Sequence, residues 1–168
     1  LPANSLEPAP REPVVDAPDR RCTKAAKAVP SNERESYDVR QVITDLLDDR
    51  WFVELRARFG SSLVVGFGRI AGLPVGIVAN QPSQLAGALD IESSIKGARF
   101  VRWCDSFNVP LLTLVDTPGF RPGRDQEWRG IVRHGAKLAF AYAEATVPRV
   151  CVVLRKAYGG AYIVMDCK

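Results

Sequence analysis

The most constraining feature of the sequence lies near its end, where a run of β-branched and apolar residues, 150–154, precedes two adjacent glycines, Gly159 and Gly160. The run is typical of a buried strand, and residues 161–165 can begin a helix. The first turn of a helix leaves N–H groups without partners inside the helix, and the helix dipole adds partial positive charge there. The junction therefore predicts a site for an anion, or for an oxygen that becomes one. A tight turn between core elements fits the same residues, because strand–glycine–helix junctions are common in α/β proteins.

The totals describe a globular chain. It has 168 residues, 46% hydrophobic and 25% charged, which is enough for one domain with its own core. The net charge of +4 suits phosphate-bearing ligands, but no basic run or aromatic-interleaved stripe indicates nucleic-acid binding. No segment approaches the roughly 18 to 20 apolar residues that span a bilayer, so no membrane partner is expected. No signal-peptide pattern occurs, although a first residue of Leu leaves open a native start upstream.

Cysteine and histidine are few and scattered. The single histidine, His134, is too little for a multi-histidine metal site, so we expect no metal. The cysteines form no C-x-x-C pair, which favours free thiols in a reducing compartment over disulfides or zinc ligands. They are Cys22, Cys104, Cys151 and Cys167.

The first part of the chain differs in amino-acid composition from the rest. Half of the twelve prolines fall within the first thirty positions, among charged residues and alanines. Because proline fixes φ and removes a donor, residues 1–36 are predicted to form an extended linker or strap. Residues 37–168 are predicted to form the folded domain.

The second part begins with an amphipathic helix and a hairpin. Apolar residues at helical spacing predict a helix over 39–47, with Asp38 as its cap and Asp45 on its polar face. Further apolar residues, Trp51 to Phe59, continue this segment to Gly60. Strands over 63–70 and 74–79, joined by Ala71-Gly72, predict a hairpin. Gly66 and Gly68 do not indicate a nucleotide site, because no helix follows them.

Strand and helix units alternate from Asp90 onward. We expect a helix over 91–107, capped by Asp90, a strand over 110–115, a helix from Asp125 to about 145, and the strand and glycine turn described above. This order predicts an α/β fold with a largely parallel sheet and ligands at the carboxyl ends of its strands. The loops at Asp116 and Lys156 both fall at that edge. Their coincidence favours the ligand interpretation of Gly159-Gly160 over the turn.

Other candidate residues have competing interpretations. The polar loop 80–84 follows a strand and suits either ligand contacts or a surface turn. A lone helical His134 is more typical of packing or a solvated face than of a general base. Asp116 precedes Thr-Pro-Gly, where an aspartate most often caps its own turn. Scattered basic residues are usually surface, although they can contact phosphates. These are Arg133, Lys137 and Arg155.

Several stretches resemble one known family. They are residues 74–82, 115–120, 131–137, 143–148 and 155–162. Together they resemble the second half of the carboxyltransferase component, the β subunit, of biotin-dependent acyl-CoA carboxylases that act on propionyl-, acetyl- or longer acyl-CoA. The resemblance covers residues 37–168. It implies a crotonase-like fold, a spiral of ββα units, of which this chain is an incomplete C-terminal carboxyltransferase domain.

The resemblance also implies a reaction and a site. In that family, carboxybiotin on a carrier releases CO2, and the biotin anion takes a proton from the α-carbon of an acyl-CoA, whose enolate attacks the CO2. The biotin oxygen is held by two backbone N–H groups, which map onto Gly160 and Ala161. Gly159 allows the turn, and Tyr158 completes the implied cofactor-binding set. Ile163 lies near the implied acyl pocket, where many propionyl-specific relatives carry Asp, so this departure suits acetyl or longer chains better.

Partners and location follow from the same resemblance. It implies a biotin carboxylase and biotin carboxyl carrier subunit, a homo-hexamer of β subunits, fatty-acid metabolism, and a place in the cytoplasm or an organelle matrix. The active site lies between the first half of one subunit and the second half of another. Because nothing in this chain corresponds to the first half, which holds the thioester, we expect a piece of the β subunit without turnover alone.

Two alternatives belong to other classes of protein. Asp116-Thr117-Pro118-Gly119 mimics the Mg²⁺-side motif of GTPases, but no G-x-x-x-x-G-K-[S/T] loop occurs to hold the phosphates. A non-catalytic assembly piece fits the proline-rich strap and the incomplete site.

Overall fold

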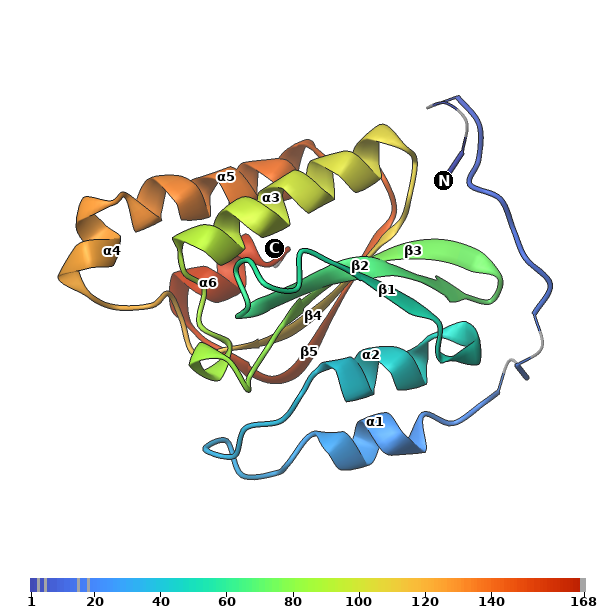
Figure 1. The fold of residues 1–168 in the computed structure, drawn as a ribbon, viewed down its shortest axis with the longest axis horizontal. Helices are drawn as coiled ribbons and strands as arrows, with labels where there is room; N and C mark the ends of the chain where they lie inside the picture. Colours follow the sequence, from blue (N-terminus) through green and yellow to red (C-terminus); the bar gives the residue numbers. More distant parts are fainter. Residues whose placement is uncertain (3, 5, 15, 18, 167–168) are drawn as a thin grey trace.

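The fold is a five-stranded sheet covered by helices on both faces. The computed structural model describes residues 1–2, 4, 6–14, 16–17 and 19–166. The strands are β1 (Phe52–Leu55), β2 (Leu63–Ile70), β3 (Leu73–Asn80), β4 (Leu111–Thr117) and β5 (Arg149–Ala157). The helices are α1 (Thr23–Ala28), α2 (Arg40–Leu46), α3 (Ile91–Ser106), α4 (Arg124–Trp128), α5 (Ile131–Glu144) and α6 (Gly159–Val164), with 3₁₀ turns η1 (Asp48–Arg50) and η2 (Leu85–Gly87). Figure 1 shows α3 and α5 side by side over one face and α1 and α2 over the other.

The sheet is half antiparallel and half parallel. Its order is β1-β2-β3-β4-β5; the pairs β1–β2 and β2–β3 are antiparallel, and β3–β4 and β4–β5 are parallel. The predicted hairpin and the parallel arrangement of the later strands are therefore confirmed. The carboxyl ends of β4 and β5 lie at the same edge, which brings the loops after them together.

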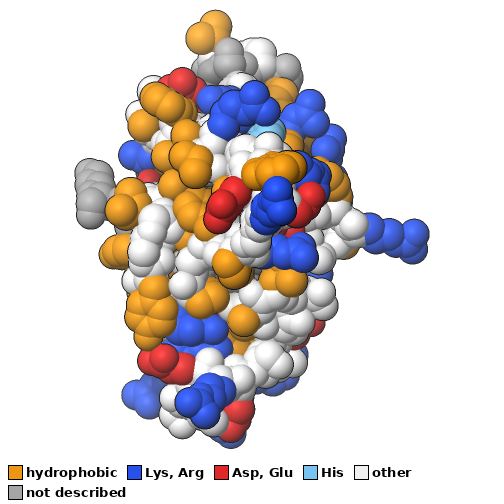
Figure 2. All heavy atoms as spheres, turned by 90° about the vertical axis from the view of Figure 1, so that its left-hand side faces the viewer, with side chains coloured by type: hydrophobic (Ala, Val, Ile, Leu, Met, Phe, Trp, Pro, Cys, Tyr) orange, Lys and Arg blue, Asp and Glu red, His pale blue; other side chains and the backbone are white. Residues whose placement is uncertain are grey.

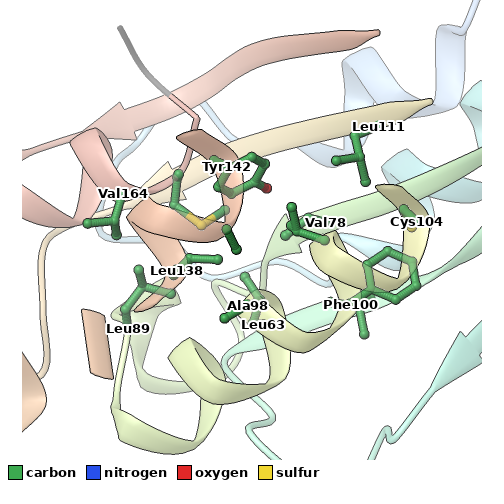
Figure 3. Close-up of a cluster of buried hydrophobic side chains, with 14 of the residues drawn as sticks. Leu63, Val78, Leu89, Ala98, Phe100, Cys104, Leu111, Leu138, Tyr142 and Val164 are labelled. Atoms are coloured by element: carbon green, nitrogen blue, oxygen red, sulfur yellow. The ribbon is translucent and has the colours of Figure 1, made fainter. Parts of the chain in front are cut away.

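The core follows the alternation of side chains along the strands. Leu63, Val65, Val78, Leu111 and Val115 face α3, α5 and α6, and their neighbours face α1 and α2. Figure 3 shows the first of these clusters, in which Leu138 and Tyr142 of α5 lie between Val164 of α6 and Val78 of β3. The packing of α6 against this cluster anchors the segment after the two glycines.

The segment after the first helix differs from the prediction. Residues 51–59 were expected to continue the apolar part of the helical segment, but Phe52–Leu55 form β1 and pair with β2. The helix stops because Leu47 is extended, with φ −86° and ψ 150°, and Asp49 then adopts a positive φ of 49°. The aromatic and β-branched residues after this break suit the edge of a sheet.

Of the two helices predicted after residue 90, the first is confirmed and the second differs from the prediction. The Asp90 cap is confirmed: its carboxylate accepts the Ser93 N–H, and the Ser93 hydroxyl accepts the Asp90 N–H. The single helix expected from Asp125 is wrong, because Gly130 has a φ of +83° and divides it into α4 and α5. Gly123, not Asp125, is the N-cap residue of α4, and Asp125 lies in the first turn, where its charge complements the helix dipole.

The predicted strap contains a short helix that packs on the folded part. Asp45, expected on a polar face, is 5% exposed and accepts the Ala25 N–H of α1 at 2.8 Å. Arg20 donates to the Asp45 carbonyl at 2.7 Å, and the Glu12 N–H donates to the Gly72 carbonyl at 3.1 Å. These contacts hold described parts of residues 1–36 against α2 and the hairpin. The domain boundary at residue 36 remains a prediction, and residues 3, 5, 15 and 18 lie outside the described part.

Three further findings concern the described residues only. No disulfide joins Cys22, Cys104 or Cys151 in the described part of the chain, and Cys167 lies outside that part. No cluster of three or more His, Cys, Asp or Glu in the described ranges is arranged to hold a metal ion. None of the helices found there has the length and apolar character that crossing a membrane requires.

Candidate functional site

The glycine turn lies where β5 ends and α6 begins. The last hydrogen bond between the ends of β4 and β5 is donated by the Tyr158 N–H to the Thr117 carbonyl, at 3.2 Å. Gly159 follows with a φ of +62°, a left-handed conformation that favours glycine. Ala161 then buries its side chain completely in the core. The predicted strand–glycine–helix junction is therefore present, with its helix anchored by packing. The strand itself is not buried as predicted: β5 lies at the edge of the sheet, and Val150, Val152 and Val153 are 59%, 40% and 46% exposed.

The amides of Gly160 and Ala161 are available as donors. Within the described residues, neither N–H donates to another backbone carbonyl, and no side chain caps α6. A residue of left-handed φ followed by a helical one turns successive N–H groups toward a common point, the arrangement called a nest. The pair can therefore donate to one oxygen that carries negative charge.

An apolar groove of about 790 Å³ borders this turn. Gly160 and Ile163 line it from α6, and Phe120 lines it from the loop after β4. Ile163 is 64% exposed, so its side chain is presented to the groove rather than packed in the core. The remaining walls come from α4, α5, α6 and the same loop: Arg121, Pro122, Glu127, Ile131, Val132, Gly135, Ala136 and Val164. Figure 2 looks onto the end of the molecule that carries α4, where hydrophobic side chains gather between basic and acidic ones.

A bulge in β5 places the turn relative to the sheet. Val115 pairs with Val153 and Thr117 with Ala157, so one residue of β4, Asp116, faces three residues of β5. Bulges of this kind bend a strand and re-aim the residues after it. The bulge thus sets the direction in which the chain enters the glycine turn.

Asp116 holds the bulge from inside. Its carboxylate is fully buried and accepts hydrogen bonds from the Lys156 N–H at 3.2 Å and the Arg155 side chain at 3.1 Å. The Tyr37 hydroxyl donates to it at 2.9 Å, and burial together with this carboxylate raises the pKa of Tyr37. Asp116 was expected to cap its own turn. That interpretation is wrong, because its partners belong to β5 and to residue 37.

Arg155 and Tyr158 join the turn to the strap. The Arg155 guanidinium donates to the carbonyls of Asn32 at 2.8 Å and Glu35 at 3.0 Å, and its side chain is only 7% exposed. Arg155 is therefore a structural clamp rather than a phosphate contact. The Tyr158 hydroxyl donates to Glu33 at 3.1 Å, and this carboxylate raises the pKa of Tyr158. The hydroxyl of Tyr158 thus hydrogen-bonds to the strap, while the residue as a whole is 48% exposed beside the turn.

The remaining candidates are not brought to the turn by any contact among the described residues. Asn80 and Gln81 are fully buried and brace the loops, since Asn80 donates to the Gly87 carbonyl and Gln81 accepts the Val39 N–H. Arg133 and Lys137 are exposed on α5. Burial, and then the charges of Lys137 and Arg133, lower the pKa of His134, whose Nδ1 is buried without a partner in the described part. The groove-lining Phe120 and Gly135 were not singled out in the sequence as site residues, because only the folded chain brings them together.

Known proteins give this geometry a context. The whole chain, residues 1–168, matches the carboxyl transferase domain family. It is 54% identical over 168 residues to the propionyl-CoA carboxylase carboxyltransferase subunit of Haloferax mediterranei, covering 100% of this chain and 33% of that protein. It is 60% identical over 140 residues to the biotin-dependent acetyl-/propionyl-coenzyme A carboxylase beta5 subunit of Mycobacterium tuberculosis, covering 83% of this chain and 25% of that one.

A solved structure shows the same fold. The chain superposes on the transcarboxylase 12S core, a hexamer with hydrolysed methylmalonyl-coenzyme A bound, with a TM-score of 0.95 and 49% identity over 98% of this chain and 32% of that one. This likeness confirms the crotonase-like α/β fold. The chain spans about a third of the length of the curated relatives that it matches. By sequence along its whole length and by fold, the chain belongs to the carboxyl transferase domain family.

Proposed function

We propose that the chain is part of a carboxyltransferase that moves a carboxyl group from carboxybiotin to the α-carbon of an acyl-CoA, giving a malonyl-CoA-type product. The observation that carries this proposal is the pair of free amides at Gly160 and Ala161 beside an apolar groove. The names of the relatives support it, because one is the carboxyltransferase subunit of a propionyl-CoA carboxylase and another is a subunit of a biotin-dependent acetyl-/propionyl-coenzyme A carboxylase.

The residues at the turn fit biotin. Gly160 lines the groove without a side chain, so a flat ring can approach the main chain there. The ring system of biotin is largely apolar with one polar ureido edge, which matches an apolar groove that ends at two N–H donors. When bound, carboxybiotin supplies the carboxyl group and then the base for the α-proton. Gly160 and Ala161 would donate to the ureido oxygen, where negative charge develops, and one such donor is typically worth about 10²- to 10³-fold in rate.

We propose that Ile163 bounds the acyl end of the groove. Its side chain lines the same groove as Gly160 and is largely exposed to it. An apolar side chain cannot hydrogen-bond to a polar substituent of the substrate, and it tolerates alkyl chains of different length. We therefore propose an acetyl-CoA or longer acyl-CoA substrate for this branch of the family.

The assembly that we propose follows the relatives. The partners are a biotin carboxylase and carrier subunit, the first half of the β subunit, and other copies in a hexamer, which is the assembly of the transcarboxylase 12S core. The proposed metabolic role is in fatty-acid metabolism. The proposed location is the cytoplasm, or an organelle matrix, since the relatives include prokaryotic and mitochondrial proteins.

Substitution of Gly160 tests the proposed site. In the full-length subunit assembled with its biotin partner, Gly160→Val should abolish carboxyl transfer to acetyl-, propionyl- and long-chain acyl-CoA while the hexamer still forms. The reason is steric, because a β-branched side chain there fills the space in front of the amides. The measurement is ATP-dependent fixation of labelled bicarbonate, with size-exclusion light scattering for assembly.

A matched control adds the same kind of bulk elsewhere. Ala143→Val changes an exposed residue of α5 outside the groove and should retain activity. Near-normal turnover by the Gly160→Val enzyme would refute the assignment of the turn.

A further inference from the structure

The ring of Phe120 occupies a position between two glycines of different helices. An ideal Cβ built on Gly135 of α5 would lie 2.7 Å from Phe120 Cζ and 2.9 Å from its Cε1. An ideal Cβ on Gly160 of α6 would lie 3.5 Å from Cε2, on the opposite edge of the ring. One edge of the ring therefore lies closer to Gly135 than any side chain there would permit, and the other reaches the glycine turn in ordinary contact.

The backbone at Phe120 is held by hydrogen bonds that involve neither α5 nor α6. The Leu89 N–H donates to the Gly119 carbonyl at 3.1 Å, and the Arg121 N–H donates to the Leu89 carbonyl at 2.7 Å. These bonds form a parallel bridge between Leu89 and Phe120, and Leu89 itself is fully buried. The ring thus projects from a backbone that is held by Leu89 and not by α5 or α6.

Gly135 lowers the stability of α5, and the close contact with the Phe120 ring explains why glycine stands there. It lies in the interior of α5, where glycine destabilises a helix relative to alanine. Its neighbour in space is the Phe120 ring, and no left-handed φ requires glycine there. The position therefore makes room for the ring rather than for an unusual backbone.

We propose that Phe120 is a positioning residue, a spacer between α5 and α6 that sets the direction of the Gly160 and Ala161 amides. The inference rests on the proposed carboxyltransferase function. A ring seated against Gly135 supports the turn from the groove side, while the core holds Ala161 from the other side. A smaller side chain leaves the turn unsupported, and a side chain at Gly135 pushes the ring toward it.

A reciprocal pair of substitutions in the full-length assembled enzyme tests this spacer. Gly135→Ala should lower kcat at least tenfold and leave the KM for acyl-CoA within about twofold, because the displaced ring disturbs the amides. Phe120→Leu should lower kcat by a smaller factor. The double variant should recover at least part of the loss caused by Gly135→Ala, because leucine makes room for the new methyl group.

A control separates positioning from packing. Phe107 is partly buried against the same core cluster but does not line the groove, so Phe107→Leu should lower the melting temperature without lowering kcat. Loss of kcat in proportion to melting temperature across all three single variants would overturn the proposal. Activity of Gly135→Ala within twofold of the parent enzyme would overturn it as well, as would a double variant no better than Gly135→Ala. If Gly160→Val is also active, the proposed function itself fails; if only Gly160→Val is inactive, the spacer alone fails.

Discussion

Single residues at the glycine turn divide their tasks. Gly159 provides a left-handed φ, Gly160 provides an open main chain, and Ala161 provides a buried anchor. Only the first of these tasks depends on backbone conformation. It can therefore be tested apart from ligand binding.

Gly159→Ala should destabilise the chain by about 1–2 kcal/mol, the usual cost of a left-handed conformation for a residue with a Cβ. No clash with the described residues contributes, because none of their atoms lies within 4 Å of an ideal Cβ at this position. Gly159→Asn should cost less, since Asn tolerates this conformation. Urea unfolding of the three proteins measures the difference. An alanine variant as stable as the parent would mean that the turn does not need a positive φ.

Lys96 is a buried cation in α3. It is 2% exposed, and its Nζ donates to the Leu63 carbonyl at 2.7 Å. Burial, aided by the nearby charges of Arg40 and Arg56, lowers its pKa to about 8. Between that value and about 10.4 in the unfolded chain, the unfolded state binds more protons, so stability contributed by Lys96 rises with pH. This contribution to stability is fully present above the pKa of about 10.4 in the unfolded chain, and it is lost as the pH falls through the folded-state pKa of about 8.

This titration is measured by comparing the free energy of unfolding of the parent chain with that of the Lys96→Met variant at different pH values. From pH 7.5 to pH 10, the parent chain should gain about 1–3 kcal/mol relative to the variant, since one pKa unit corresponds to about 1.4 kcal/mol. Urea titrations at both pH values give the difference. Parallel curves for the two proteins would show that Lys96 does not titrate in this window.

Elements are joined at the site through the bulge between β4 and β5. Asp116→Asn should lower the free energy of unfolding by about 3–5 kcal/mol, because Arg155 and Lys156 would remain buried without their counter-charge. Glu92→Gln removes one of the two carboxylate partners of Arg129, whose side chain is 53% exposed, and should change the free energy of unfolding far less than Asp116→Asn does. Chemical unfolding of both variants makes the comparison. Equal effects would contradict a supporting role for Asp116.

Elements with local signals were predictable from the sequence. The Asp90 cap and the spacing of apolar residues placed a helix over 91–107, and α3 runs from Ile91 to Ser106. The break at Gly130 was not foreseen, because an isolated glycine is tolerated in many helices. β1 was missed for another reason: its four residues are too few to show a period of two, and its pairing with β2 decides its conformation.

At the scale of the whole molecule, the contacts that shape the site join distant positions. Asp116 meets Arg155 across 39 residues, and Phe120 meets both Gly135 and Gly160. No local pattern encodes such contacts, so the glycine turn was predictable and its supports were not. Asp45 shows the same limit, since its burial depends on α1 packing against α2.

A structure of the full-length assembly with bound biotin tests the central claim most directly. The ureido oxygen should lie about 2.7–3.1 Å from the nitrogen atoms of both Gly160 and Ala161, the spacing of a pair of oxyanion donors. A ureido oxygen bound by other groups, with these two amides facing away from it, would contradict the account.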